Sequence, residues 1–433
     1  MKIALVCEVY LPKVDGVVGR TLNLIQHLQA LGDDVLVCCP AVPEQRKSPT
    51  SLVECPSFPC VSYPDYHIGL PSAHLVRCLQ KFQPDVIHFL NPLAFGFAAC
   101  LEIRKHQLSA PLVFSFHTQY GEFVRTYPGL AWLSSILWQV MRAFHNLADV
   151  NLTVSQTMLE ELEKRGFERM FLWPPAVDAD RYSPDFRSAS MRERLSGNHS
   201  TQPLLLSVSR LAAEKNVGFL SEIIDRIPEA RLAVVGDGPE RPALERRFLG
   251  RQTCFTGCLT GKALAQAYAS SDVFVYASET ETMGNVILEA MASGVPIVAA
   301  DAGGVKSLIR HQETGFLFEP GNGPQAAAFV RKLLTDQKLR LQMAAAARAD
   351  AEARSWSAAV DTVRQSYRLA QQVHRQSPTP RPLSPLAQAA VRILLQGFRL
   401  GTRIRTNPLS TAELMTNPGS VNEYEQDFHQ KSA

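Results

Sequence analysis

Short, uniformly apolar runs alternate along the chain with segments in which apolar residues recur every three or four positions. Residues 2–7 (KIALVC) form the first run, and Val17–Leu31 show the first helical pattern. The residues that share one face of this helix are Val18, Leu22, Ile25 and Leu28. Because runs without polar alternation are typical of parallel strands covered on both faces, the pattern predicts an α/β fold of doubly wound sheets.

This strand-and-helix pattern occurs twice, with a stretch rich in proline and polar residues between the two occurrences. Further runs lie at 34–39, 84–90, 110–116 and 149–154, and then at 203–208, 231–236, 272–277 and 296–300. We expect two facing Rossmann-like domains with the active site in the cleft, where the strands' carboxyl ends meet. The predicted parts are an N-terminal, acceptor-side domain (1–179), a linker (180–202), a C-terminal, nucleotide-sugar-binding domain (203–355), a helix that closes it (356–375) and a Pro-rich break with a basic tail (376–433).

Composition limits the classes of protein to consider. Of 433 residues, 46% are hydrophobic and 20% charged, as in globular domains, and a net charge of +3 gives no reason to expect a nucleic-acid partner. The opening apolar run is too short for a signal peptide, and no stretch approaches the length of a membrane span. The nine cysteines form no CxxC pair, so we interpret them as reduced core residues of a cytoplasmic protein.

The segment 278–294 (SETETMGNVILEAMASG) places two glutamates in and before an apolar helical pattern. We expect Glu281 in the loop after a strand and Glu289 inside the helix, where a carboxylate is costly unless it is hydrogen-bonded. Hydroxyl groups of a sugar and a ribose are suitable donors. The residues before the helix offer backbone N–H groups to a phosphate: Thr282, Met283 and Gly284. The alternative is a capping glutamate and a surface glutamate.

The segment 207–216 (SVSRLAAEKN) places two cations directly after a predicted strand. Arg210 and Lys215 would then lie at the carboxyl end of that strand, beside the start of a helix. Two cations in this position can neutralise a diphosphate leaving group. The alternative is a solvated loop in which neither cation has a ligand.

Three more residues follow predicted strands. Gly236 opens the sequence GDGP and is a candidate donor-binding residue, but Arg241 stands where the glycine fingerprint of nicotinamide enzymes needs its third glycine. This argues against an oxidoreductase. Gly16 would allow the backbone to approach a ligand closely. His117 should face the cleft, and a purely structural histidine is the alternative.

Together and in order, these motifs resemble those of the retaining, GT-B fold glycosyltransferase family 4, and the resemblance covers about residues 1–372. Glu281 and Glu289 match the family's E-x7-E motif, which implies contacts with the donor sugar's hydroxyls and with the ribose, respectively. Arg210 and Lys215 match its diphosphate-binding pair. The implied activity is transfer of a hexose from a nucleotide-diphosphate sugar.

Two matches lie in the N-terminal half. Gly16 matches the family's glycine loop, although many members have two glycines there. His117 matches the cleft histidine near the C6 hydroxyl of the donor sugar. An inactive sugar-nucleotide-binding homologue is the alternative, but such a protein would be expected to have lost His117, Lys215, Glu281 or Glu289, and all four are present.

Within the family, the chain is most similar to glycolipid-forming enzymes such as sulfoquinovosyl-diacylglycerol and cyanobacterial-type digalactosyldiacylglycerol synthases. The opening LPKVDGVV, the segment FHTQY and the Leu-Trp before Val177-Asp178 carry this similarity. Those relatives usually have a basic residue before Val-Asp, where this chain has Pro174, Pro175 and Ala176. Because a sulfonate needs a cation, we expect UDP-galactose as donor and a galactolipid as product. Sulfoquinovosyl, mannosyl and glucosyl transfer are the alternatives.

The resemblance also implies a mechanism. In front-face transfer the leaving phosphate accepts the proton of the acceptor, while Arg210 and Lys215 stabilise its charge. We therefore expect neither a cofactor nor a metal. Asp178 and Asp180 spell the DxD metal motif of other glycosyltransferases, but they fall near the predicted linker and we interpret the match as chance.

The C-terminal tail predicts attachment to a membrane. From Arg381 to Arg405 there are five arginines and no acidic residue. As a helix, this segment would place Leu386, Ala390, Ile393, Leu400 and Ile404 opposite Arg392, Arg399 and Arg403, the pattern of an interfacial helix. We expect a peripheral enzyme on an anionic membrane face, acting on a lipid acceptor. Docking of the helix on the protein is the alternative, and Leu130–Val140 is a second membrane candidate.

Overall fold

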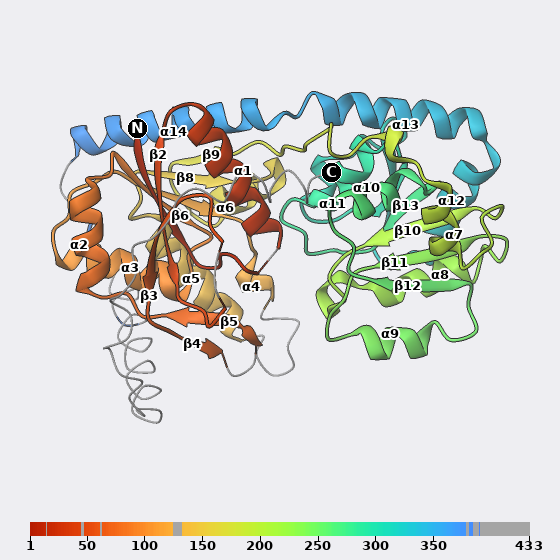
Figure 1. The fold of residues 1–433 in the computed structure, drawn as a ribbon, viewed down its shortest axis with the longest axis horizontal. Coiled ribbons are helices and arrows are strands. Elements are labelled where there is room, and N and C mark those ends of the chain that lie inside the picture. The colour runs from red at the N-terminus through yellow and green to blue at the C-terminus, as the bar shows by residue number, and fades with distance from the viewer. Residues whose placement is uncertain are drawn as a thin grey trace.

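The chain folds into two α/β domains, each built on a parallel sheet (Figure 1). The computed structural model describes residues 1–13, 15–44, 47–60, 63–123, 132–377, 381–383 and 389. Both sheets contain the apolar runs identified in the sequence, and every strand pair within them is parallel. The predicted α/β architecture with two doubly wound domains is confirmed.

The N-terminal sheet has seven strands in the order β3-β2-β1-β6-β7-β8-β9. Their bounds are Lys2–Cys7 (β1), Asp34–Pro40 (β2), Ser51–Cys55 (β3), Val86–Leu90 (β6), Leu112–Phe116 (β7), Val150–Thr153 (β8) and Met170–Leu172 (β9). Every residue of β6 and β7 is buried, as expected for central strands with helices on both faces. An antiparallel hairpin, Ser57–Cys60 (β4) and Tyr63–Gly69 (β5), lies outside this sheet and was not predicted.

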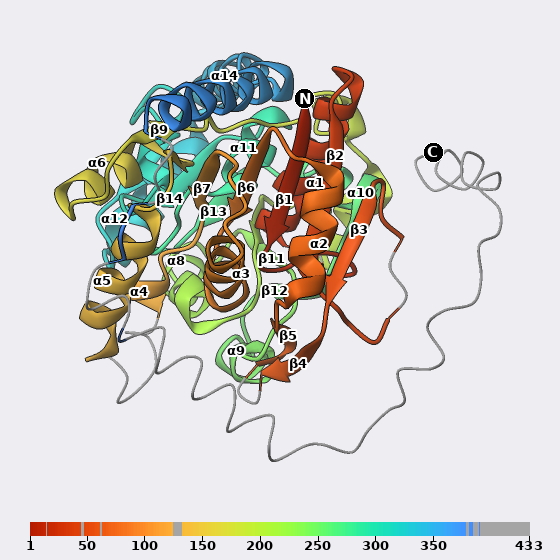
Figure 2. The ribbon, with the colours of Figure 1, turned by 90° about the vertical axis from the view of Figure 1, so that its left-hand side faces the viewer.

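The described part of this domain contains six helices, and Figure 2 shows α2 and α3 in front of the sheet strands. Their bounds are Gly16–Ala30 (α1), Ala73–Phe82 (α2), Ala94–Lys105 (α3), Tyr120–Phe123 (α4), Leu133–His145 (α5) and Gln156–Lys164 (α6). The first agrees with the predicted helix. It begins where Asp15 accepts hydrogen bonds from the backbone of Val17 and Val18, which satisfies two N–H groups that a helix start leaves free.

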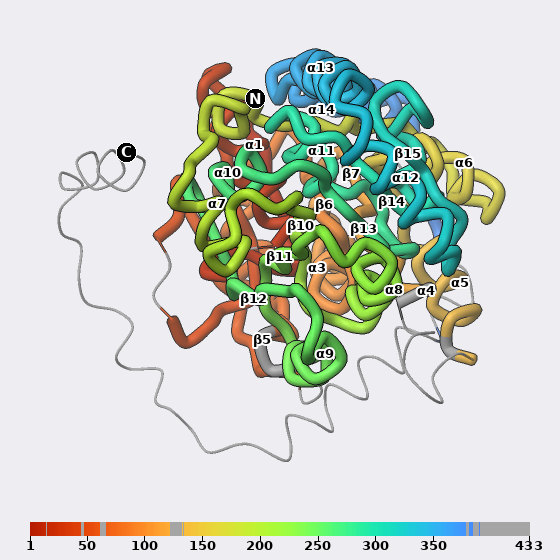
Figure 3. Tube along the Cα trace, turned by 90° about the vertical axis from the view of Figure 1, so that its right-hand side faces the viewer, coloured from red at the N-terminus to blue at the C-terminus, as the bar shows by residue number. Residues whose placement is uncertain are grey.

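The C-terminal sheet has six strands in the order β12-β11-β10-β13-β14-β15. They are Leu204–Val208 (β10), Arg231–Val235 (β11), Thr253–Gly257 (β12), Val273–Tyr276 (β13), Ile297–Ala300 (β14) and Gly315–Phe318 (β15). Figure 3 shows this domain from its outer side, with α12 beside β14 and β15. The helices are Ala189–Ser196 (α7), Leu220–Ile224 (α8), Arg241–Arg247 (α9), Gly261–Ala269 (α10), Asn285–Ala292 (α11), Gly323–Thr335 (α12) and Gln337–Glu352 (α13).

The predicted linker, 180–202, is part of the C-terminal domain. It contains helix α7, whose start is capped by Ser188, and Met191 and Leu195 of this helix are buried in the C-terminal core. The chain passes between the two cores earlier, at Ala176 and Val177. The prolines and polar residues of this stretch interrupt the apolar pattern, so a helix with only two large buried side chains was not recognised.

Helix α14 (Trp356–Gln376) follows the C-terminal domain in sequence but packs on the N-terminal one (Figure 1). Val360, Val363 and Tyr367 are buried with residues of the N-terminal sheet, and the Tyr367 hydroxyl lies 2.8 Å from Nδ1 of His88 on β6. The helix was predicted, but its assignment as the helix that closes the C-terminal domain is wrong. Periodicity identifies an apolar face without showing which sheet that face covers.

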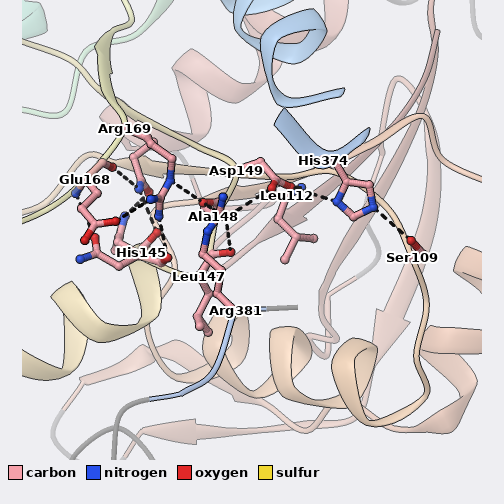
Figure 4. Close-up of polar contacts among 12 residues, drawn as sticks. Ser109, Leu112, His145, Leu147, Ala148, Asp149, Glu168, Arg169, His374 and Arg381 are labelled. Carbon is pink, nitrogen blue, oxygen red and sulfur yellow. Dashed lines mark hydrogen bonds and ion pairs between the residues drawn. The ribbon is translucent and has the colours of Figure 1, made fainter. Parts of the chain in front are cut away.

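A buried carboxylate holds the end of this helix and the residues that follow it (Figure 4). Asp149 is 5% exposed and accepts a 2.9 Å hydrogen bond from the backbone of Leu112. Its carboxylate also lies 3.4 Å from Nδ1 of His374 and 3.3 Å from Nη1 of Arg381. The predicted tail therefore begins on the N-terminal domain. Apart from residue 389, its proposed amphipathic helix lies outside the described residues.

Candidate active site

The candidate site residues follow the carboxyl ends of strands in both sheets. Gly16 follows β1, His117 follows β7, and Gly236 follows β11. Arg210 and Lys215 follow β10, and Glu281 follows the neighbouring β13. The two sets meet at the interface between the domains, where Nδ2 of Asn285, the first residue of α11, lies 3.5 Å from the carbonyl oxygen of Gly16. This is the position in which parallel sheets bind ligands.

Lys215 and Glu281 form an ion pair. Lys215 ends the 3-10 turn Ala213–Lys215, and its Nζ donates to Oε1 of Glu281. The Tyr276 hydroxyl, from β13, donates to the same oxygen at 2.6 Å. Burial by itself raises the pKa of Glu281, but attraction to Lys215 and the hydrogen bonds from Lys215, Tyr276 and Ser278 outweigh it, so the pKa lies below its ordinary value. Glu281 is therefore an ionised acceptor at neutral pH.

Glu289 lies on α11 in different surroundings. The hydroxyl of Tyr268, on α10, donates to its Oε2 at 2.8 Å, and Tyr182 is a second hydrogen-bonding neighbour. Burial raises the pKa of Glu289 to about 7, because the hydrogen bonds from these two phenols and the charge of Arg181 compensate only part of the desolvation. The two glutamates of one motif thus differ in charge state around neutrality. Glu289 is a hydrogen-bond donor at lower pH and a pure acceptor at higher pH.

Arg210 lies on the same loop as Lys215, and its Nη2 donates to Glu214 at 2.7 Å. The backbone carbonyl of Glu214 accepts hydrogen bonds from the hydroxyls of Ser278 and Thr280, at 3.2 and 3.3 Å. These bonds connect the loop of the two cations to the loop that carries Glu281. The structure therefore brings both predicted motifs of the C-terminal domain together, although they are more than 60 residues apart.

The start of α11 has backbone N–H groups without a side-chain cap. Gly284 precedes the helix in the left-handed region, with φ of 92°, which favours glycine. Two adjacent glycines pack against this loop: a Cβ on Gly303 would lie 2.5 Å from the carbonyl oxygen of Glu281, and one on Gly304 would lie 2.1 Å from that of Thr282. The sequence analysis missed this pair, for which the adjacent glycines after β14 were the available signal.

Gly236 is required by close packing of two backbone segments. Its φ is 134°, and a Cβ at this position would lie 1.9 Å from the carbonyl oxygen of Ser209. Gly238 approaches the carbonyl oxygen of Leu211 in the same way. The GDGP turn therefore fixes the loop that begins at Arg210, so Gly236 acts on the site through this loop.

His117 is buried at the carboxyl end of β7, and its Nε2 lies 2.9 Å from the hydroxyl of Ser115. Burial, followed by the charge of Arg20 and the proximity of His88, lowers the pKa of His117 well below its ordinary value. The ring is therefore neutral at physiological pH. Its edge faces the indole of Trp173, with ring centroids 5.3 Å apart.

Arg20 is a cation that the sequence analysis missed. It lies one turn after Gly16 on α1, is 3% exposed, and stacks over the Trp173 ring at 4.2 Å. Its Nη2 donates to the carbonyls of Trp173 and Pro174, and its Nη1 lies 3.2 Å from Sδ of Met283. Position 20 falls within a regular helical pattern, so the sequence alone gives no signal that this residue reaches the other domain.

Known glycosyltransferases are similar to this chain along both domains. The model of Glycosyltransferase Family 4 matches residues 14–181, and that of Glycosyl transferases group 1 matches residues 192–350. Sulfoquinovosyl transferase SQD2 of Arabidopsis thaliana is 39% identical over 81% of this chain and 70% of its own length. A GDP-mannose-dependent alpha-mannosyltransferase of Mycobacterium tuberculosis is 33% identical over 85% and 96% of the two chains.

The chain belongs to the glycosyltransferase group 1 family. It is an enzyme, a nucleotide-sugar-dependent hexosyltransferase. A more distant member, the alpha-monoglucosyldiacylglycerol synthase of Acholeplasma laidlawii, is 24% identical over 69% of this chain and 80% of that protein. HepE from Anabaena, in complex with UDP and glucose, has a TM-score of 0.66 at 21% identity, covering 84% of this chain and 99% of that one. This likeness confirms the GT-B fold.

Other features of this glycosyltransferase bear on the sequence predictions. The nine cysteines are free, as predicted, but only five of them are buried in the core; three are half-buried and Cys258 is exposed. Asp178 accepts hydrogen bonds from the backbone of Asp180 and Arg181, so part of the DxD sequence is used in a local turn. Among the described residues, no group of three or more histidine, cysteine or acidic side chains is arranged to hold a metal ion. No helix in the described part of the chain is long and apolar enough to cross a membrane.

Proposed function

We propose that this enzyme is a retaining glycosyltransferase that moves a hexose from a UDP-sugar to a membrane glycerolipid. The observation that carries the proposal is the arrangement at the domain interface. Lys215 and Glu281 of the C-terminal domain form an ion pair after neighbouring strands of their sheet, and Glu289 lies on the helix that begins at Asn285. Asn285 in turn lies 3.5 Å from Gly16 of the N-terminal domain, in which His117 follows the carboxyl end of β7. This arrangement provides cations for a diphosphate and carboxylates for hydroxyl groups.

The proposed reaction replaces one bond at the anomeric carbon by another on the same face. The bond between C1 and the β-phosphate oxygen breaks, the acceptor oxygen bonds to C1, and the acceptor's proton passes to a phosphate oxygen. The products are UDP and a glycolipid. Lys215 and Arg210 stabilise the charge that develops on the leaving diphosphate, and Glu281 and Glu289 orient the sugar and the ribose. Neutral His117 contacts the donor sugar as a hydrogen-bonding group.

Two UDP-sugars are candidate glycosyl donors, UDP-sulfoquinovose and UDP-galactose. The identity to the sulfoquinovosyl transferase supports a sulfonated hexose. The absence of a basic residue among Pro174, Pro175 and Ala176 favours galactose, the donor expected from the sequence. Arg20 weakens that second argument, because its guanidinium is hydrogen-bonded to the same stretch of chain. We therefore place UDP-sulfoquinovose first and UDP-galactose second.

We propose that transfer needs no divalent metal, because Arg210 and Lys215 supply positive charge at the proposed diphosphate site. The test is activity after exhaustive treatment with EDTA, with and without added Mg²⁺ or Mn²⁺. Unchanged turnover supports the proposal. Loss with EDTA and recovery with metal contradicts it, and Asp178→Asn would then show whether the DxD sequence is involved.

A lipid acceptor requires the active site to reach a bilayer, and we propose that the N-terminal domain and the C-terminal tail make this contact. The named diacylglycerol product of the Acholeplasma laidlawii relative supports a lipid acceptor. Docking of Arg381 on Asp149 supports a tail that starts on the acceptor-side domain. Flotation with anionic liposomes, comparing the full chain with one that ends at Gln376, tests the tail. Equal flotation at physiological salt would show that the tail is not the anchor.

The decisive experiment for the function is a donor and acceptor panel. The purified full chain is incubated with UDP-sulfoquinovose, UDP-galactose, UDP-glucose and GDP-mannose, each with vesicles that contain diacylglycerol or a monohexosyl-diacylglycerol. Products are identified by mass and their anomeric configuration by NMR. A glycolipid with the donor's configuration supports the proposal. Inverted configuration, or turnover with none of these lipids, contradicts it.

A further inference from the structure

Arg20 is a buried guanidinium without a carboxylate partner among the described residues. Its exposed fraction is 3%, and burial lowers its pKa to about 9, so it stays charged at neutral pH. Two half-buried arginines, by contrast, have acidic partners: Arg192 pairs with Asp272 at 2.8 Å, and Arg364 pairs with Asp33 at 2.8 Å. A buried charge is costly unless an opposite charge or strong hydrogen bonds compensate it.

The hydrogen bonds of Arg20 compensate this cost in part. Nη2 donates to two backbone carbonyls, of Trp173 at 3.1 Å and Pro174 at 2.7 Å. Nη1 contacts the thioether of Met283, which is a weak acceptor. Nε has no hydrogen-bond partner among the described residues, although it is fully enclosed. Of these groups, Nη1 is the donor for which an anion would be a stronger acceptor than its present thioether partner.

Arg20 lies at the candidate active site. Met283 follows Glu281 by two residues on the loop before α11. Arg20 and His117 both contact the Trp173 ring, whose centroid lies 4.2 Å from the guanidinium carbon and 5.3 Å from the imidazole centroid. Arg20 and His117 also interact electrostatically. Arg20 therefore faces the region between the N-terminal domain and the Glu281 loop, where the proposed function places the donor sugar.

We propose that Arg20 is a specificity-determining residue that binds an anionic substituent of the donor sugar, of which a sulfonate on C6 is the chemical class we favour. This inference rests on the proposed function. A sulfonate has three oxygens that accept hydrogen bonds, and a guanidinium presents its N–H groups in a planar fork. Helix α1 thus supplies the cation that the stretch between Trp173 and Val177 lacks in its own sequence.

The test compares UDP-sulfoquinovose with UDP-glucose, which carries a hydroxyl in place of the sulfonate at C6. Three variants of the full chain are used: Arg20→Met, which removes the charge at similar length, Arg20→Lys, which keeps it, and Arg368→Met, an exposed control on α14. Turnover is measured with both donors, and the affinities of UDP and both UDP-sugars by calorimetry. Thermal melting shows whether each variant folds.

We expect Arg20→Met to lower kcat/KM and affinity for the sulfonated donor by about 10- to 100-fold, since charge-assisted hydrogen bonds are lost. The values for UDP-glucose should change less than about threefold, and Arg20→Lys should recover part of the selectivity. Arg368→Met should behave as the wild type.

Three outcomes would overturn the inference. Equal losses for both donors would make Arg20 a structural clamp on Trp173 and Pro174. A parallel loss of UDP affinity would place it on the diphosphate. A wild type that binds the sulfonated donor no better than UDP-glucose would exclude a sulfonate site. Failure of the proposed function appears differently, as absence of lipid product while the difference between donors in calorimetry persists.

Discussion

The two faces of the active site balance their charges in different ways. On the donor-domain face, formed by Arg210, Lys215, Glu281 and Glu289, each cation has a carboxylate partner, Lys215 with Glu281 and Arg210 with Glu214. On the N-terminal face, formed by Gly16, Arg20 and His117, burial keeps His117 neutral, and Arg20 is held by carbonyls and a thioether. In the proposed function, the donor-domain face binds the diphosphate and hydroxyl groups common to all nucleotide sugars, and the N-terminal face binds what distinguishes one sugar from another.

The largest expected effect concerns the donor-domain face. Lys215→Ala should lower kcat by about 100-fold or more, because removal of one preorganised charge at a developing anion costs this much in other enzymes. Arg210→Ala should have an effect of the same order. Lys338→Ala, which removes an exposed lysine on α13, is the matched control. Steady-state turnover with the best donor of the panel is the measurement, and near-normal turnover of Lys215→Ala would contradict the assigned role.

The second prediction separates the two glutamates of the motif by pH. The folded pKa of Glu289 is raised from 4.5 to about 7, so between these values the folded protein holds a proton that the unfolded chain has lost. The contribution of Glu289 to the free energy of unfolding is therefore highest at low pH and falls as the pH rises from 4.5 to about 7. This pKa shift corresponds to a loss of about 3 kcal/mol in the free energy of unfolding. Glu289→Gln, which stays neutral, should lack this loss.

Thermal melting between pH 5 and 8 measures this difference. The wild type should lose stability relative to Glu289→Gln across this range. Glu281→Gln is the comparison, because the folded pKa of Glu281 is lowered: its contribution is present above 4.5 and is lost only as pH falls through the lowered value. Glu281→Gln should therefore leave the change of melting temperature between pH 5 and 8 the same as in the wild type. If the melting temperatures of the wild type and of Glu289→Gln change with pH in the same way, the raised pKa of Glu289 is refuted.

A third prediction concerns how the N-terminal domain holds α14. Asp149→Asn keeps an acceptor for the backbone of Leu112 but removes the charge that faces His374 and Arg381. We expect a loss of about 1–2 kcal/mol in the free energy of unfolding, because the Arg381 side chain is partly exposed at 26% and its charge is partly screened. Chemical denaturation is the measurement.

The matched control for Asp149→Asn is Glu313→Gln, which breaks the ion pair with Arg310 in the C-terminal domain. The Glu313 side chain is 67% exposed, so this change should cost a few tenths of a kcal/mol at most. Equal effects of the two substitutions would show that Asp149 does not hold α14 more firmly than a surface pair holds a loop.

The sequence predicted the donor-domain face better than the N-terminal one, for a physical reason. Arg210, Lys215 and Glu281 lie in short segments directly after apolar strands, so a one-dimensional pattern places them at one sheet edge. Arg20 lies inside a regular helix and reaches Met283 only through tertiary packing. The packing of α14, the helix within 180–202 and the β4–β5 hairpin were missed for the same reason: periodicity defines an element but not its partner.

The smallest expected effect tests the N-terminal domain as the membrane-facing side. Trp132 and Ile136 are 67% and 46% exposed at the start of α5, four positions apart and so on one side of the helix. Replacing both by alanine in the full chain should weaken binding to anionic vesicles by roughly fivefold, about 1 kcal/mol, since Trp and Ile side chains gain from the apolar boundary of a bilayer. Their exposure implies little change in folding stability. Leu249→Ala with Leu341→Ala, which removes two exposed leucines of the C-terminal domain, is the matched control and should bind as the wild type does. If both double variants lose vesicle binding equally, or neither does, the membrane contact does not distinguish the two domains.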